Sequence, residues 1–344
     1  MAENSLYKIG ITHGDINGIG YEVIIKALAD NKIMDLCIPV VYGLAKVATY
    51  YKKSLDLHDF NFQFIKNLNQ VSVKKSNLLN LSDQEIKLEV GNSTDIAGKM
   101  ARLSLENACK DLQNNMIDAI VTAPINKSNI QGEGFQYPGH TEYLTHFFNS
   151  PDSLMMMVAE SVKIGFATNH IPLKAVAKTL TGDLILKKLR ILNKSLVYDF
   201  GSTNPKIAVL SLNPHAGDHG LTGNEESEII APAISKAFDE KINAFGPFPA
   251  DGFFGAGKYR QFDAVLALYH DQGMIPFKLL SMDEGVNYTA GLPIVRTSPA
   301  HGTAYELAGK NQSSGQSFRN AVYLALDILK NRQNLKGNNS KNGK

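Results

Sequence analysis

The sequence predicts an α/β protein with a largely parallel sheet, built as two lobes. Short apolar runs typical of buried strands alternate along the chain with segments of helical periodicity. The chain has 344 residues, which is long enough for a large core divided between two lobes. Hydrophobic residues make up 44% and charged residues 20%, an ordinary composition for a globular protein.

Strand and helix signals follow one another in chain order. Strands are predicted at 6–12, 37–43, 116–124, 154–160, 162–168, 206–212 and 264–269. Helices are predicted at 21–30, 98–112, 181–196, 222–238 and 317–331. Thr222 stands three residues before Glu225, a spacing typical of a capping box that opens a helix. The polar, glycine-rich segment 336–344 is predicted to be a flexible tail.

Charge and cysteine content exclude several classes of protein. The formal charge is +2 and no basic stripe accompanies it, so nothing indicates nucleic-acid binding. Cys37 and Cys109 form no Cys-x-x-Cys pattern, which favours buried or incidental thiols in a reducing compartment. The first residues lack the pattern of a signal peptide, and no apolar run approaches the span of a bilayer. We therefore expect a cytoplasmic protein without nucleic-acid or membrane partners.

Three apolar runs each end in a histidine: His170, His215 and His270. In open α/β sheets the carboxyl ends of the strands line the crevice where ligands bind. Three imidazoles delivered to that edge suit a zinc ion with one coordination position open for substrate. Asp271 follows His270 and is a candidate to orient an imidazole. The alternative is that these are three unrelated loop histidines.

Two polar segments carry weaker signals. "GDINGIGYE" (14–22) lacks the third glycine of the dinucleotide fingerprint, because Val23 stands there, so a tight turn into a helix is the safer interpretation. Farther on, Lys278, Asn287 and Arg296 have the chemistry to bind an anion such as phosphate, although scattered surface polar residues would look the same. His140 and Thr141 are neighbouring donors before a predicted helix.

Longer motifs resemble one family. "HGTAYELAGKNQ" is similar to the adenosine-binding segment of isocitrate and isopropylmalate dehydrogenases. From about residue 9 to 331, the chain resembles the 4-hydroxythreonine-4-phosphate dehydrogenase family. The resemblance is carried by the first loop and, in order, by "TAPINK", "GHTEYL", "LNPHAG", "GNEE", "GPFPADGFF", "YHDQG" and "NYTAGLPIVRTSPAHGTA". The first motif usually has prolines where this chain has His13 and Ile16, and Asn126 stands where histidine is common.

The resemblance implies a fold like that of isocitrate and isopropylmalate dehydrogenases, with two α/β lobes around a cleft. The expected lobes are 1–128 with 276–335, and 129–275. The metal ligands of the family match His170, His215 and His270. Its phosphate and substrate contacts match His140, Thr141, Lys278, Asn287 and Arg296. The segment "PAHGTA" is expected to form part of the nucleotide site through His301, Gly302, Thr303 and Ala304.

The implied reaction uses NAD or NADP without a classical Rossmann domain, and a divalent metal that is zinc, magnesium or cobalt. The family oxidises 4-phosphooxy-L-threonine to a β-keto acid that decarboxylates to 3-amino-2-oxopropyl phosphate, in pyridoxal 5'-phosphate biosynthesis. Its active site lies at a homodimer interface. Lys127 and Asp251 are both candidates for the general base. The alternatives are a dehydrogenase of a phosphorylated four-carbon sugar acid, 4-phospho-threonate or 4-phospho-erythronate, and a metal-binding relative that does not catalyse.

Overall fold

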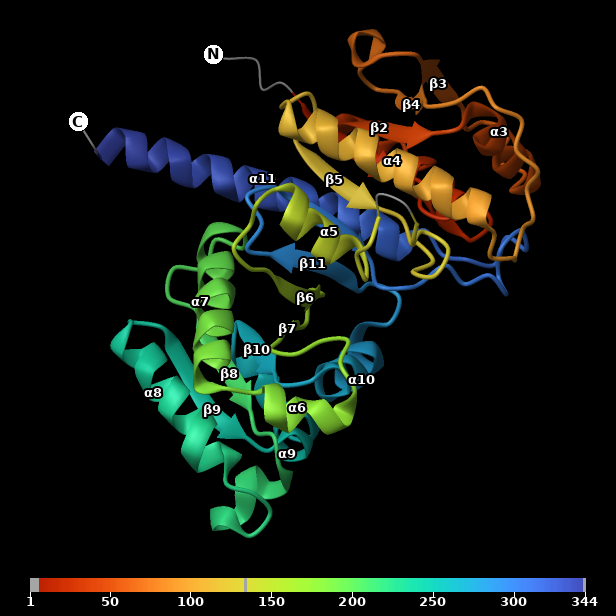
Figure 1. The fold of residues 1–344 in the computed structure, drawn as a ribbon. Helices are drawn as coiled ribbons and strands as arrows, with labels where there is room; N and C mark the ends of the chain where they lie inside the picture. The colour runs from red at the N-terminus through yellow and green to blue at the C-terminus, as the bar shows by residue number, and fades with distance from the viewer. Residues whose placement is uncertain (1–5, 133–134, 343–344) are drawn as a thin grey trace. The chain divides into compact units, whose positions relative to one another are not determined.

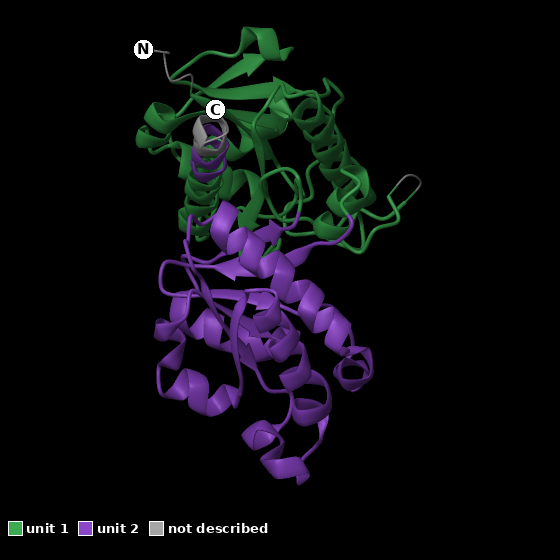
Figure 2. Cartoon of the chain, turned by 90° about the vertical axis from the view of Figure 1, so that its left-hand side faces the viewer, with its two compact units in different colours: residues 1–150, 292–329 green, residues 151–291, 330–344 purple. Residues whose placement is uncertain are grey.

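The structure is a computed structural model that describes residues 6–132 and 135–342 (Figure 1). The chain forms two compact units, residues 1–150 with 292–329 and residues 151–291 with 330–344 (Figure 2). These boundaries differ from the expected lobes at all three crossings. Residues 330–335 belong to unit 2, where Asn331 and Arg332 donate hydrogen bonds to Asp199. Residues 129–150 belong to unit 1 because Phe135, Tyr143 and Leu144 pack into its core. Residues 276–291 belong to unit 2 because β11 (Val286–Ala290) pairs with β6 (Leu154–Val158).

Unit 1 contains a parallel sheet with helices of the same unit packed on it. Its strand order is β3 (Phe62–Ile65), β4 (Ser76–Asn80), β2 (Cys37–Gly43), β1 (Tyr7–Thr12), β5 (Ala119–Thr122) and β12 (Arg296–Pro299). Its helices are α1 (Gly20–Leu28), α2 (Lys32–Leu36), α3 (Ala45–Ser54), η1 (Leu68–Gln70), α4 (Asp95–Gln113), α5 (His140–Phe147) and the first part of α11 (Gln316–Asn342). Every residue of β2 is buried, which is typical of parallel strands that are covered on both faces of the sheet.

Helix α4 supplies one side of the core of unit 1. It lies across β1, β2 and β5 (Figure 1). Its buried positions Ala101, Leu105, Ala108 and Leu112 recur at the three- and four-residue spacing of one helix face. The helix begins after Thr94, whose hydroxyl accepts a hydrogen bond from the Ala97 amide at 3.3 Å, as an N-cap residue does.

Unit 2 contains a mixed sheet. Its strand order is β11, β6, β7 (Lys163–Phe166), β10 (Ala264–Ala267), β8 (Lys206–Leu210) and β9 (Asn243–Phe248). Strand β6 is antiparallel to both of its neighbours, β11 and β7, whereas β7, β10, β8 and β9 run parallel to one another. Its helices are α6 (Leu173–Thr179), α7 (Gly182–Tyr198), η2 (Pro214–Gly220), η3 (Glu226–Ile230), α8 (Ala231–Asp239), α9 (Ala250–Gly255), η4 (Lys258–Gln261), α10 (His270–Ser281) and the end of α11. Helices α7 and α8 lie side by side (Figure 1).

Most of the expected elements are present, and three details differ from the expectations or add to them. The expected capping box is absent, because the Thr222 hydroxyl donates to the Pro214 carbonyl at 2.9 Å and η3 begins only at Glu226. Segment 336–342 is helical, as the end of α11, and its flexibility stays a prediction. Strands β3, β4, β9, β11 and β12 were not predicted, because they are short and carry polar or glycine residues that mask the strand pattern.

In the part of the chain that the structure describes, no helix is both long and apolar enough to cross a membrane. Cys37 and Cys109 are buried free thiols, as the sequence indicated.

Candidate active site

In unit 1, three loops leave the carboxyl ends of neighbouring parallel strands. They follow β1, β5 and β12, which are adjacent in the order β1, β5, β12. The first is the "GDINGIGYE" loop, the second begins "APINK", and the third contains "AHGTA". The carboxyl ends of parallel strands are where α/β proteins place their ligand sites, so this edge is the candidate site of unit 1.

Arg296 contacts this edge through its side chain. It is the first residue of β12 and only 3% exposed. Its Nε and Nη2 donate to the Thr122 hydroxyl at 3.1 and 2.7 Å, and Thr122 is the last residue of the neighbouring strand β5. Burial lowers the pKa of Arg296 to about 10, which still leaves the guanidinium charged at neutral pH. A fixed, buried cation with planar donors is suited to a phosphate or carboxylate group.

His140 adds a neutral hydrogen-bond donor beside the charged Arg296 side chain. Arg296 Nη2 lies 3.2 Å from His140 Nδ1, and a guanidinium only donates, so Nδ1 accepts and the ring proton lies on Nε2. Burial, together with the charges of Arg296 and Lys127, holds the pKa of His140 well below 6.5. The Nε2 atom is buried and has no hydrogen-bond partner among the described residues. His140 therefore presents an N–H group that a ligand oxygen would satisfy.

Lys127 and the start of α5 add positive potential to the same place. The Lys127 Cε lies 3.6 Å from the position that a Cβ on Gly139 would occupy, and Gly139 is the N-cap of α5. His140 and Thr141 are the first two residues of this helix, whose unpaired amides favour an anion. The structure thus brings Lys127, His140, Thr141 and Arg296 together in unit 1, as a set suited to an anionic substrate.

The first loop is a tight turn, as predicted, and its carboxylate is buried. Asp15 Oδ1 accepts from the Asn17 amide at 2.9 Å. Asp15 Oδ2 accepts from Asn129 Nδ2 at 2.7 Å and from the Tyr305 hydroxyl at 2.8 Å. The loop also meets the segment after β12 directly, because the Ile19 amide donates to the Thr303 carbonyl at 3.0 Å. The first loop therefore holds the expected nucleotide segment in place through hydrogen bonds to Thr303 and Tyr305.

The expected nucleotide residues themselves lie on the loop after β12. Burial lowers the pKa of His301, whose Nε2 is buried without a partner in the described structure. A Cβ on Gly302 would meet nothing within 4 Å, so space is open beside this backbone. Ala304 has a φ of 42°, a left-handed conformation that alanine seldom adopts. Together they form a strained loop with one unsatisfied imidazole nitrogen, features typical of a ligand site.

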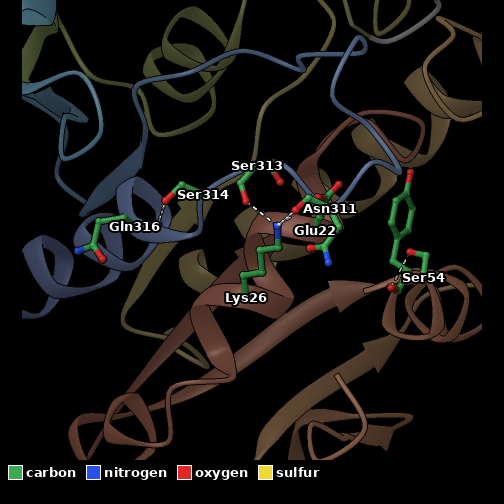
Figure 3. Close-up of polar contacts among 8 residues, drawn as sticks. Glu22, Lys26, Ser54, Asn311, Ser313, Ser314 and Gln316 are labelled. Carbon is green, nitrogen blue, oxygen red and sulfur yellow. Dashed lines mark hydrogen bonds and ion pairs between the residues drawn. The ribbon is translucent and has the colours of Figure 1, made fainter. Parts of the chain in front are cut away.

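The chain that follows this loop is held against α1 by a lysine (Figure 3). Lys26 Nζ donates to the Ser313 carbonyl at 2.6 Å and to the Asn311 carbonyl at 3.1 Å. It also pairs with Glu22 Oε1 at 3.3 Å, and the Glu22 side chain is fully buried. Lys26 thus fixes the turn between the nucleotide segment and α11.

In unit 2, the three histidines follow three adjacent parallel strands. His170 follows β7, His270 follows β10 and His215 follows β8, and β10 lies between the other two strands. Two side chains join these strand ends. The Thr168 hydroxyl donates to the Leu268 carbonyl at 2.7 Å. Gln272 accepts from the Leu268 amide at 2.7 Å and donates to the Ser211 carbonyl at 2.6 Å.

The histidines share an edge without forming a complete metal site in this chain. The rings of His170 and His270 are 5.8 Å apart between centroids, a spacing compatible with two imidazoles on one ion, since zinc–nitrogen distances are about 2 Å. His270 Nδ1 lies 2.7 Å from Asp271 Oδ1, so Asp271 does contact an imidazole. Across residues 6–132 and 135–342, however, no three histidine, cysteine, aspartate or glutamate side chains are placed to hold a metal ion.

The remaining expected residues also lie in unit 2. Lys278 is exposed on α10, and Asp251 is exposed on α9, directly after β9. Asn287 lies on β11, and its Oδ1 is buried with no hydrogen-bond partner among the described residues. Sequence reasoning missed Thr122, Asp15 and Tyr305. Thr122 carried a usable signal, because it lies near the end of the predicted strand 116–124, whereas Asp15 and Tyr305 are 290 positions apart and only the fold joins them.

A buried arginine, a neutral histidine and further imidazoles near the strand ends of an α/β protein form an arrangement suited to binding small anions. The comparisons identify the family of this chain. Residues 35–325 match the family described as "Pyridoxal phosphate biosynthetic protein PdxA", and the chain belongs to this family.

The relatives cover nearly the whole chain. A 4-hydroxythreonine-4-phosphate dehydrogenase from Bacteroides thetaiotaomicron is 50% identical over 334 residues, covering 97% of this chain and 91% of that protein. A protein from Oceanobacillus iheyensis, provisionally named a D-threonate 4-phosphate dehydrogenase, is 38% identical over 324 residues, covering 93% and 97%. The crystal structure of 4-hydroxythreonine-4-phosphate dehydrogenase from Klebsiella pneumoniae has a TM-score of 0.82 at 34% identity, covering 95% of this chain and 99% of that one. The predicted family and α/β fold are confirmed.

Proposed function

We propose that the chain is a NAD(P)-dependent dehydrogenase that oxidises 4-phosphooxy-L-threonine in pyridoxal 5'-phosphate biosynthesis. The observation that carries this proposal is the 50% identity, over almost the whole chain, to a relative named for that activity. The anion-binding set around Arg296 and His140 supports a phosphorylated substrate.

The expected reaction balances as an oxidation followed by loss of carbon dioxide. The substrate alcohol loses its proton to a base and its carbon loses a hydride, which gives a β-keto acid. Decarboxylation of that acid gives 3-amino-2-oxopropyl phosphate. When bound, the nicotinamide takes up the hydride and a divalent metal polarises the reacting oxygen.

The residues of this chain position the substrate and move its proton. Arg296 and the Nε2–H of His140 bind oxygen atoms of the substrate, and Thr141 adds the start of α5. Lys278 and Asn287 are the further contacts that the family resemblance implies. Lys127 and Asp251 are the two candidates for the base. Lys127 is the better placed of the two, because its Cε lies near Gly139, the residue before His140.

His170, His215 and His270 are the proposed metal ligands. Imidazoles suit zinc, the metal we favour, while magnesium and cobalt are the alternatives. The adjacent strand ends and the ring spacing of His170 and His270 support this set.

We further propose a homodimer that completes the active site with residues of both chains. The support is that α10, which begins with His270, exposes an apolar row. Ile275 is 60% exposed, Leu279 83% and, just past the helix end, Met282 64%. These positions are spaced four and three residues apart and so share one helix face, of the kind that a second copy covers. Two buried free thiols are in keeping with a cytoplasmic enzyme.

The second candidate substrate is a phosphorylated four-carbon sugar acid, because the Oceanobacillus relative is named for D-threonate 4-phosphate. The two substrates differ in an amino or hydroxyl group, while Arg296 and His140 suit the phosphate common to both. The test is formation of reduced nicotinamide with each substrate, using NAD and NADP in turn. A higher kcat/KM for 4-phospho-threonate would replace our first assignment with the second. Turnover of neither substrate would leave the metal-binding, non-catalytic relative as the best description.

A further inference from the structure

His215 is carried on a left-handed turn. Residues 215–219 all have positive φ angles, between 43° and 85°, and only the middle residue is glycine. A left-handed conformation costs an L-residue about 1–2 kcal/mol. Such a run persists only where the surrounding structure holds it. Contacts from elsewhere in the fold must therefore hold the backbone that enters this turn.

Glu226 makes these contacts. It is 5% exposed and begins η3, a π-helical turn before α8. Its Oε1 accepts hydrogen bonds from the amides of Leu212 at 2.8 Å and Asn213 at 2.7 Å, the residues that lead into the turn. Its Oε2 accepts from Asn213 Nδ2 at 3.0 Å. One carboxylate therefore fixes the chain between β8 and His215 through three donors.

The same carboxylate lies against the turn itself. A Cβ on Gly217 would lie 2.9 Å from Glu226 Oε2 and 2.8 Å from the Gly223 carbonyl oxygen, so only glycine lets the turn approach so closely. The Thr222 amide donates to the Gly217 carbonyl at 3.1 Å and closes the turn from the other side. The position of His215 thus depends on a buried acceptor at residue 226.

We propose that Glu226 is a positioning residue for the metal site, which acts by holding the left-handed turn that presents His215. This inference rests on the proposed function, in which His215 is a metal ligand. A carboxylate is required because both oxygens must accept. An amide at this position either points its NH2 group at Asn213 Nδ2 or gives up the two backbone amides. Groups that hydrogen-bond to a metal ligand change metal affinity by about 10- to 100-fold when they are removed, and we take this range for Glu226, which orients the ligand through its backbone.

The test compares Glu226→Gln with Glu228→Gln, which makes the same charge change at an exposed position of the same turn. Metal affinity is measured by competition of Zn²⁺ or Co²⁺ with a chelator, and kcat and KM are measured separately. We expect Glu226→Gln to weaken metal binding by about 10- to 100-fold. We also expect an unchanged KM for the nicotinamide cofactor and recovery of kcat at high metal concentration. Glu228→Gln should behave as the wild type.

A second variant and the wild type distinguish the remaining outcomes. Should Glu226→Gln fail to fold, Asn213→Ala removes one of the three donors and should weaken metal binding by a smaller factor. Wild-type metal affinity in a folded Glu226→Gln protein would overturn the inference. A loss of cofactor and metal affinity by the same factor would also overturn it, because a general structural defect affects both. A wild-type protein that binds no divalent metal would instead refute the proposed metal site, and this inference with it.

Discussion

Arg296 donates a hydrogen bond from Nη2 to His140 Nδ1 at 3.2 Å, across 156 positions of sequence. Both side chains can be cationic, and the arrangement requires that only the arginine is charged. The cation next to it and the burial of the ring both disfavour protonated His140. The pair therefore offers a ligand one fixed positive charge and one neutral N–H donor.

The first prediction concerns Arg296→Lys. An ammonium group cannot donate to Thr122 and His140 and also reach a phosphate with planar geometry, as the guanidinium does. We expect KM for the phosphorylated substrate to rise by about tenfold or more, since hydrogen bonds to charged groups contribute about 1.5–3 kcal/mol. The KM for NAD(P) should change much less. Steady-state kinetics with each ligand varied in turn measure both values.

The control is Arg190→Lys, a surface arginine paired with Glu240. It should leave both KM values unchanged. An equal rise in both KM values for Arg296→Lys would point to misfolding or to a nucleotide role for Arg296.

The second prediction concerns pH and His13. This ring is fully buried, stacks on Tyr21 at 5.2 Å, and has a pKa that burial lowers to about 4. Below the ordinary value of 6.5 the unfolded chain takes up a proton that the folded chain refuses, so stability falls as pH decreases from 6.5 toward 4. Between pH 7 and pH 5 this group should remove about 2 kcal/mol from the free energy of unfolding.

His13→Phe keeps an aromatic ring and removes the titration. Urea denaturation at both pH values should show a smaller loss of stability in this variant than in the wild type, by about the same 2 kcal/mol. Any loss of stability that the substitution causes equally at both pH values cancels, because each protein is compared with itself between the two pH values. His140 and His301 also have lowered pKa values and contribute a loss of the same sign in both proteins. Identical pH dependence in the two proteins would contradict the prediction.

The third prediction concerns the ion pair shown in Figure 3. Lys26→Met leaves the fully buried Glu22 carboxylate without its cation and frees the carbonyls of Asn311 and Ser313. Breaking one side of a buried pair costs about 3–5 kcal/mol, so we expect a loss of that order in the free energy of unfolding.

Glu22→Gln combined with Lys26→Met should be more stable than Lys26→Met alone, because the buried charge has gone. A double-mutant cycle by chemical denaturation measures this coupling. Additive losses would show that the two charges do not depend on each other.

The sequence was informative where one local pattern decides the structure. Apolar runs such as Cys37–Gly43 became strands, and the strand-end histidines lie at adjacent parallel strands because the order of strand and helix fixes which ends face one edge. The polar segment Arg296–Pro299 gave no such signal, since it forms a strand only by pairing with β5. Neither the left-handed turn at His215 nor the Arg296–His140 contact is encoded locally, because each depends on side chains distant in sequence.

The fourth prediction concerns the metal. His215→Ala removes one of the three proposed ligands, so bound divalent metal and activity should fall together. Metal content after dialysis, measured by atomic emission, and turnover are compared with those of His219→Ala. His219 lies on the same turn and is not a proposed ligand, so this control should retain both properties. Full metal content together with full activity in His215→Ala would reject the proposed site.

The fifth prediction concerns assembly, and it asks whether one active site uses both chains. His170→Ala and Arg296→Ala are each expected to be inactive alone. If a site takes His170 from one chain and Arg296 from the other, each mixed dimer contains one site with both residues intact and one site with neither. Unfolding the two variants together and refolding them should then restore about a quarter of the wild-type activity, since random pairing makes half of the dimers mixed. Refolding each variant separately before mixing is the control and should restore nothing.

If both residues of a site come from one chain, the mixed dimers have no intact site and activity stays absent. The chain that supplies His270 is found by the same experiment with His270→Ala in place of His170→Ala. Sedimentation of the wild type decides the premise, because a monomer that retains full activity on dilution would show that no second chain is needed.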